Sequence, residues 1–184
     1  MSEQSARKVV FVLGGVRSGK SRYAQDLAGR GQRVAIIATA EACDDDMAQR
    51  IARHRSERPA NWTTFESPLA LEDTLLECGN QFDTVLVDCL TVWTANIMQA
   101  EASDEARVLD HANRLAEVLR RISASVILVS NEVGSGIHPN SEIGRVFRDL
   151  LGFVNQRVAA VADEVILLVA GCPLVIKQPA EALA

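Results

Sequence analysis

The sequence predicts a three-layer α/β protein, in which a mostly parallel sheet has helices on both faces and a C-terminal antiparallel hairpin. Short runs rich in Val, Ile and Leu alternate with longer amphipathic stretches. Continuous apolar strands separated by helices are typical of a parallel sheet buried on both faces. The last two apolar runs, 164–169 and 174–176, are separated by a short turn at 171–173, which predicts the closing hairpin.

The other elements follow from the glycines, prolines and charged residues that punctuate the chain. Strand 8–13 ends at two glycines, and helix 20–29 follows it. After strand 33–39, the acidic run 44–46 begins a helix that continues to about residue 55, because acidic groups favour a helix N-terminus. The remaining expected elements are strand 61–66, helix 68–78, strand 84–87, helices 91–100 and 104–122, strand 125–129 and helix 141–161.

The size and composition indicate one domain over residues 1–184. The chain is 48% hydrophobic and 23% charged, as is usual for globular proteins. Its net charge of -5 does not suit a protein that coats a nucleic-acid backbone, so we expect no nucleic-acid partner.

A cytoplasmic location is expected from three features of the chain. The four cysteines form no CxxC pair and are interpreted as reduced thiols. No apolar stretch reaches the roughly 20 residues that span a bilayer, and the N-terminus lacks the pattern of a signal peptide.

Polar candidates follow the expected strands at the points where those strands end. They are Gly14, Thr39, Asp88 and Asn131. Because ligands of such sheets bind at the carboxyl ends of the strands, we expect these residues to gather at one edge.

The loop after the first strand matches the phosphate-binding pattern G-x-x-x-x-G-K-S. Glycines let its backbone N–H groups turn towards phosphate oxygens, and the following helix N-terminus adds its dipole. The alternative, a glycine-rich turn that binds nothing, is disfavoured because Lys20 is one of only three lysines. The pattern therefore predicts a P-loop NTPase-like fold whose loop consists of Gly14, Gly15, Val16, Arg17, Ser18, Gly19, Lys20 and Ser21.

Ser21 and Asp88 are the candidate ligands of a magnesium ion. In P-loop proteins the residue after the lysine offers its hydroxyl to Mg²⁺, and an acidic residue at a neighbouring strand end holds the ion directly or through water. The alternative for Asp88 is a cap on the helix that follows.

His54 lies in a basic stretch that a simple kinase does not explain. Neighbouring arginines disfavour its protonation, and a neutral imidazole can attack phosphorus as a nucleophile. A solvated histidine on an exposed basic helix is the alternative that the residues themselves leave open.

Motifs along most of the chain resemble one family, the bifunctional adenosylcobinamide kinase / adenosylcobinamide-phosphate guanylyltransferases of coenzyme B12 synthesis. The resemblance covers roughly residues 9–177. It rests on the loop 14–22, IAT at 37–39, DDM at 45–47, RP at 58–59, VDCLT at 87–91, SNEVG at 130–134, FRD at 147–149 and ADEV at 162–165.

The resemblance implies two reactions. A nucleoside triphosphate, ATP or GTP, phosphorylates adenosylcobinamide; the enzyme then takes GMP from GTP onto a histidine and passes it to adenosylcobinamide phosphate. His54 matches the guanylylated histidine. The resemblance also implies Mg²⁺ and a homotrimer. By the same matching, the guanine nucleotide site includes Thr39, Ala40, Glu41, Arg55, Ser56, Glu57, Arg58, Glu66 and Asp88.

Some interpretations stay open at this point. Glu132 is expected either to polarise the substrate hydroxyl or Mg²⁺, or to order its loop. His111, inside a polar helix, is expected to be solvated, and His138 is expected to be structural or exposed. A monofunctional P-loop kinase with an inert His54, and a GTP-dependent regulator without turnover, remain the alternative functions.

Overall fold

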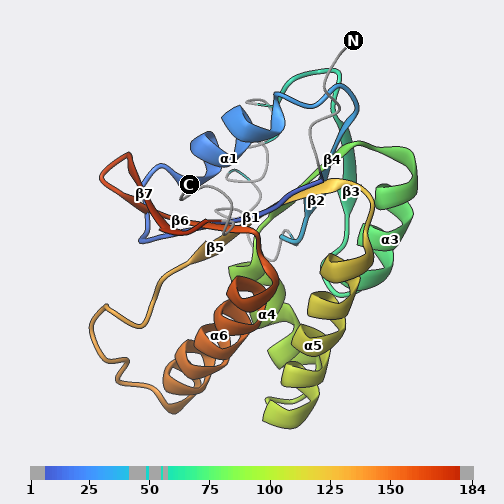
Figure 1. Cartoon of the computed structure of the whole chain (residues 1–184). Helices are drawn as coiled ribbons and strands as arrows, with labels where there is room; N and C mark the ends of the chain where they lie inside the picture. The colour runs from blue at the N-terminus through green and yellow to red at the C-terminus, as the bar shows by residue number, and fades with distance from the viewer. Residues whose placement is uncertain (1–6, 42–48, 50–54, 56–57, 179–184) are drawn as a thin grey trace.

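A computed structural model describes residues 7–41, 49, 55 and 58–178 of the chain. Within these residues, seven strands form one sheet in the order β3-β2-β4-β5-β1-β6-β7 (Figure 1). All neighbouring strands are parallel except β6 and β7, which are antiparallel. The expected fold class, with its C-terminal hairpin, is therefore confirmed.

The observed elements agree closely with the predicted ones. The strands are β1 (Val9–Gly14), β2 (Val34–Ala38), β3 (Thr63–Glu66), β4 (Thr84–Asp88), β5 (Ser125–Asn131), β6 (Glu164–Val169) and β7 (Cys172–Lys177). The helices are α1 (Lys20–Ala28), α3 (Leu71–Gln81), α4 (Leu90–Ala100), α5 (Glu105–Arg121) and α6 (Glu142–Val161). The acidic run at 44–46 and most of the helix expected to follow it lie outside the described residues.

Helices cover both faces of the sheet, because alternate residues of the buried strands point to opposite sides. Phe11 packs in the core shared with α3, α4, α5 and α6, whereas Val12 packs in the core shared with α1. Figure 1 shows α1 on one side of the sheet and the other four described helices on the opposite side. None of the described helices is both long and apolar enough to cross a membrane.

The carboxyl ends of the central strands lie side by side, as the sequence predicts. Gly14 of β1 is in register with Asn131 of β5, and Asp88 of β4 is in register with Ala38 of β2. Thr39 follows β2 directly, and its backbone N–H donates to the Asp88 carbonyl at 3.2 Å. The four polar candidates therefore end up along one edge.

The closing hairpin is tighter than the sequence predicts. Its turn consists of Ala170 and Gly171, with φ values of 50° and 82°, so the expected turn at 171–173 is wrong. Pro173 instead lies inside β7. A proline is tolerated there because β7 is the edge strand and no further strand needs the missing N–H.

His111 is not solvated as expected, because its side chain is only 19% exposed. Its Nδ1 lies 3.1 Å from a carboxylate oxygen of Glu72 on α3, and the ring packs edge-on against Trp93 of α4. The imidazole thus joins three helices far from the phosphate loop. His138 is exposed, and its Nδ1 lies 2.6 Å from Arg148.

Candidate nucleotide site

The phosphate loop connects β1 to α1 through backbone conformations that favour glycine. Gly19, just before α1, has φ 98°, and Arg17 has φ 57°. Such left-handed residues turn successive N–H groups towards one side, and nests of this kind bind anions. The loop thus ends where the dipole of α1 attracts negative charge.

Gly14 is required by close packing as well as by conformation. A Cβ atom built at this position would lie 2.5 Å from Ser18 Oγ and 2.6 Å from the Leu168 carbonyl oxygen, with φ at 156°. Ser18 is itself buried, and its Oγ has no hydrogen-bond partner among the described residues. The first glycine of the pattern therefore lets the loop fold back onto β1 and β6.

Lys20 is held inside the loop. Its side chain is only 8% exposed, and its Nζ donates a 2.7 Å hydrogen bond to the Gly15 carbonyl. Burial lowers the pKa of Lys20, while the charges of Cys89 and Asp88 act in the opposite direction. A buried ammonium is stabilised by an anion, so the loop can receive phosphate.

Asp88 acts electrostatically on both Lys20 and Arg58. Its negative charge opposes the lowering of the pKa that burial causes in each of these two cations. The pKa of Arg58 is lowered overall, because burial outweighs the effect of Asp88. The positive charge of Arg55 lowers the pKa of Arg58 further. Two basic side chains thus feel the charge of one carboxylate at the end of β4, a combination of charges suited to a bound triphosphate and its metal.

Thr39 ties β2 to the segment after β4. Its fully buried hydroxyl donates to the Cys89 carbonyl at 2.8 Å and accepts from the Cys89 N–H at 3.0 Å. Asn96 of α4 donates to the Thr39 carbonyl at 2.8 Å. Ala40 and Glu41 follow directly on this anchored residue, so the end of β2 is held against β4.

The segment after β5 is bonded to the phosphate loop. The Asn131 N–H donates to Thr91 Oγ1 at 2.8 Å, and the Glu132 N–H donates to the Gly14 carbonyl at 3.1 Å. One carboxylate oxygen of Glu132 accepts from the Gly134 N–H at 2.7 Å. This last contact shows that Glu132 orders its own loop, one of the two roles considered for it.

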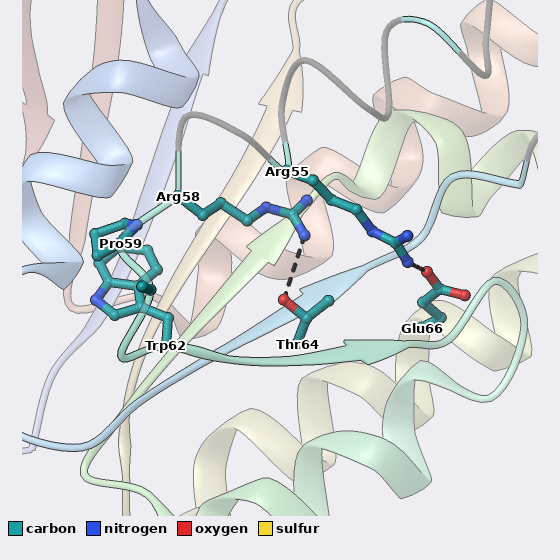
Figure 2. Close-up of a pocket in the computed structure, with 7 residues that line it drawn as sticks. Arg55, Arg58, Pro59, Trp62, Thr64 and Glu66 are labelled. Atoms are coloured by element: carbon teal, nitrogen blue, oxygen red, sulfur yellow. Dashed lines mark hydrogen bonds and ion pairs between the residues drawn. The ribbon is translucent and has the colours of Figure 1, made fainter.

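A hollow of about 370 Å³ lies beside β3, and its lining includes Arg55, Arg58 and Glu66. Figure 2 shows Arg55 pointing to Glu66, with which it forms an ion pair, and Arg58 pointing to Thr64, whose Oγ1 lies 3.4 Å away. Pro59 lies beside Trp62 at the other end of the hollow. The site residues predicted at 55, 58 and 66 therefore meet in one cavity, which also includes Trp62, a residue to which the sequence analysis assigned no role.

Three of the predicted site residues, His54, Ser56 and Glu57, lie outside the described residues. Val16 is exposed in the phosphate loop, and Ser21 is half-buried in the first turn of α1. Their predicted roles stay predictions.

Gly171 is a residue of the site that the sequence analysis missed. Its N–H donates to the Ser18 carbonyl at 2.9 Å, so the β6–β7 turn touches the phosphate loop. Thr91 was also missed as the partner of Asn131. For Gly171, the available signal was a glycine inside a two-residue turn. For Thr91, nothing nearby in the sequence indicates a contact with Asn131.

The parallel sheet, the glycine loop and the buried Lys20 define a P-loop nucleotide-binding protein. The chain belongs to the family described as cobinamide kinase / cobinamide phosphate guanyltransferase, whose family model matches residues 10–176.

Curated relatives match the chain over nearly their whole length. It is 43% identical over 168 residues to a bifunctional adenosylcobalamin biosynthesis protein, CobP, of Pseudomonas aeruginosa, covering 91% of this chain and 96% of that protein. It is 40% identical over 180 residues to the bifunctional adenosylcobalamin biosynthesis protein CobU of Salmonella typhimurium, covering 92% and 99%.

Solved structures of distant proteins share the fold alone. An ATPase of a bacterial type III secretion system superimposes with a TM-score of 0.55 at 13% identity, covering 87% of this chain and 50% of that chain. The ATPase EscN of enteropathogenic E. coli gives 0.56 at 13% identity, covering 88% and 42%. The chain thus spans half or less of the length of these ATPases.

Proposed function

We propose that the chain carries out both reactions of its family in adenosylcobalamin biosynthesis. A nucleoside triphosphate, ATP or GTP, phosphorylates the hydroxyl of adenosylcobinamide, and GMP from GTP is then transferred to adenosylcobinamide phosphate to give adenosylcobinamide-GDP. The observation that supports this most directly is the phosphate loop with its buried Lys20 next to Asp88 at the ends of β1 and β4.

Ser21 and Asp88 are the proposed ligands of Mg²⁺. Ser21 follows Lys20 directly in the first turn of α1, and Asp88 ends β4 and acts electrostatically on Lys20. This donor set fits a magnesium ion, which usually takes one or two protein oxygens along with phosphate oxygens and water. The ion, when bound, neutralises charge on the phosphates, while Lys20 binds and orients them.

His54 is the proposed carrier of GMP. Its imidazole nitrogen attacks the α-phosphorus of GTP, a P–N bond forms, and the bond to the bridging oxygen breaks to release pyrophosphate. A phosphate oxygen of adenosylcobinamide phosphate then attacks the same phosphorus, and the histidine leaves. Two displacements replace one difficult transfer.

The cavity at Arg55, Arg58 and Glu66 is the proposed guanine nucleotide site, together with Thr39, Ala40, Glu41, Ser56, Glu57 and Asp88. The cavity carries both positive and negative side chains, which suit the phosphate end and the base end of a guanine nucleotide. Arg58, partly stripped of water, offers donors to phosphate, and the carboxylate of Glu66 can accept hydrogen bonds from a base. Trp62 supplies an aromatic wall.

We also propose that the chain is a single catalytic domain, is cytoplasmic and forms a homotrimer. The described strands all belong to one sheet. The edge strand β7 exposes apolar side chains, including Leu174 and Ile176. An exposed apolar edge favours association with another copy, which would cover it. Light scattering of the wild type and Ile176→Glu tests this: the trimer is expected to weaken in the variant.

The test of the function is product analysis with purified protein, Mg²⁺, GTP and adenosylcobinamide. Mass spectrometry is expected to detect adenosylcobinamide phosphate and then adenosylcobinamide-GDP. Lys20→Ala is expected to lose both products, whereas Lys177→Ala, whose ammonium donates to α6 carbonyls, retains them. The phosphate alone would indicate a monofunctional kinase, and neither product would indicate a regulator.

A further inference from the structure

A second hollow lies on the side of the sheet covered by α6. It measures about 260 Å³ and lies between the loop after β5 and the outer surface of α6. Its lining residues are Gly134, Arg148, Asp149, Gly152, Phe153 and Gln156. Neither the phosphate loop nor the Arg55 cavity includes any of them, so the roles proposed above leave this hollow unexplained.

Two consecutive hydrogen bonds connect this hollow to the phosphate loop. The Gly134 N–H at its rim donates to Glu132 Oε1 at 2.7 Å, and the Glu132 N–H donates to the Gly14 carbonyl at 3.1 Å. The loop that bounds the hollow is therefore hydrogen-bonded, through Glu132, to the loop that holds the phosphates of the donor. A kinase must bind its acceptor next to these phosphates, because the acceptor hydroxyl has to reach the terminal phosphorus.

The lining combines open apolar surface with a few fixed polar groups. Gly152 is a glycine within α6, so it leaves its part of the helix surface open. A Cβ atom built at Gly152 meets nothing within 4 Å. Phe153 is 38% exposed beside it. Arg148 is held by Asp149 Oδ1 at 3.1 Å and lies 2.6 Å from His138 Nδ1, so its guanidinium stays in place at the rim.

We infer that this hollow binds the corrinoid substrate, an inference that rests on the proposed function. Cobinamide is a broad macrocycle whose rim carries methyl and primary amide groups. Apolar surface at Gly152 and Phe153 suits the methyl groups, and Arg148, Asp149 and Gln156 offer donors and acceptors that match amides. The volume accommodates one edge of the macrocycle, which leaves the arm that carries the hydroxyl free to extend past Glu132 to the phosphate loop.

The decisive variant is Gly152→Leu, which fills the hollow from a position with room for a side chain. Ala160→Leu is the matched control, because Ala160 is an exposed residue of the same helix that does not line the hollow. Three quantities are measured for the wild type and both variants: cobinamide binding by equilibrium dialysis, the KM values of the kinase reaction, and the formation of the enzyme–GMP adduct from GTP alone.

Gly152→Leu is expected to weaken cobinamide binding and to raise the KM for adenosylcobinamide by about tenfold or more, as steric filling of an apolar pocket does. The KM for the nucleotide and the yield of adduct stay at the wild-type level, and Ala160→Leu changes none of the three. The thermal unfolding temperature is recorded for each variant. If Gly152→Leu is poorly folded, Phe153→Ala gives the same comparison by removing apolar contact.

Unchanged cobinamide binding in a folded Gly152→Leu would overturn the inference. A change of oligomeric state with unchanged binding would do so as well, and would assign the hollow to subunit contact. A wild-type enzyme that binds cobinamide in this hollow but does not phosphorylate it would refute the proposed function and leave the binding site standing.

Discussion

The backbone N–H of Gly171 donates a 2.9 Å hydrogen bond to the carbonyl oxygen of Ser18. The turn of the β6–β7 hairpin thus rests on the phosphate loop, although the two residues are far apart in the sequence. A Cβ atom built at Gly19 would lie 3.4 Å from the Gly171 Cα. The hairpin turn therefore also packs closely against Gly19, the residue before Lys20. A loop that must hold its N–H groups in place before phosphate arrives is stabilised by such a brace.

Substitution of Gly171 is expected to disturb the phosphate loop, although Gly171 is far from that loop in the sequence. Gly171 has φ 82° and open space around its Cβ direction, so the penalty of Gly171→Val is conformational rather than steric, about 1–2 kcal/mol of folding stability. We expect a lower unfolding temperature and a severalfold higher KM for the triphosphate. Gly171→Asn, which tolerates the left-handed conformation, is the control and stays near the wild type. Tight nucleotide binding by a folded Gly171→Val would refute the role of the brace.

Gly14 and Gly15 are adjacent, yet we expect their alanine variants to differ sharply. Gly14→Ala places its methyl group against Ser18 Oγ and the Leu168 carbonyl at a positive φ, which costs on the order of 2 kcal/mol or more. Gly15→Ala meets nothing within 4 Å. Urea unfolding of both variants measures the difference, and equal stabilities would show that the loop does not pack on β6 in this way.

Gly152→Ala is expected to stabilise the protein. The residue lies within α6, where glycine is less favourable than alanine by about 0.5–1 kcal/mol, and the added methyl group meets no neighbour. Thermal and urea unfolding check the sign. A destabilised variant would mean that the space beside Gly152 is filled in the folded protein, contrary to the hollow described above.

Cys89 is expected to resist alkylation at mildly alkaline pH. Burial, followed by the charge of Asp88, raises the pKa of its thiol from 9.0 to about 11. Alkylation needs the thiolate, so at pH 9 the exposed Cys172 reacts with iodoacetamide while Cys89 does not. Peptide mass spectrometry distinguishes the two, and rapid modification of Cys89 in the folded protein would contradict the raised pKa of its thiol.

The raised pKa of the Cys89 thiol also predicts how the free energy of unfolding changes with pH. Between pH 9 and 11 the unfolded chain releases the Cys89 proton while the folded protein keeps it, so the free energy of unfolding falls as pH rises. The slope is at most about 1.4 kcal/mol per pH unit for this thiol. Urea unfolding of the wild type and Cys89→Ala is expected to show a shallower decline in the variant.

Much of the fold was predictable because its signals are local. The glycine loop and the apolar strands each depend on a few neighbouring residues. The helices expected from 104 and 141 begin one residue later, because Asp104 and Ser141 accept a backbone hydrogen bond as N-caps. The edge formed by Gly14, Thr39, Asp88 and Asn131 followed from a general property of parallel sheets.

The parts that escaped prediction depend on tertiary contact. The turn glycine Gly171 can be recognised in the sequence, but its contact with Ser18 depends on the fold, as does the electrostatic effect of Asp88 on Arg58. His111 is a different case. It adjoins the buried stripe of Val108, Ala112 and Leu115 on α5, so helical periodicity indicated partial burial, and only its partner Glu72 required the fold.

The guanylyl-histidine is the central claim, and it is tested most directly by incubating the protein with α-labelled GTP and Mg²⁺ before denaturation. We predict label that survives denaturation, is released by acid, is absent from His54→Ala and is retained by His138→Ala. Wild-type protein that binds GTP but keeps no label, or His54→Ala that keeps it, would contradict the proposed mechanism.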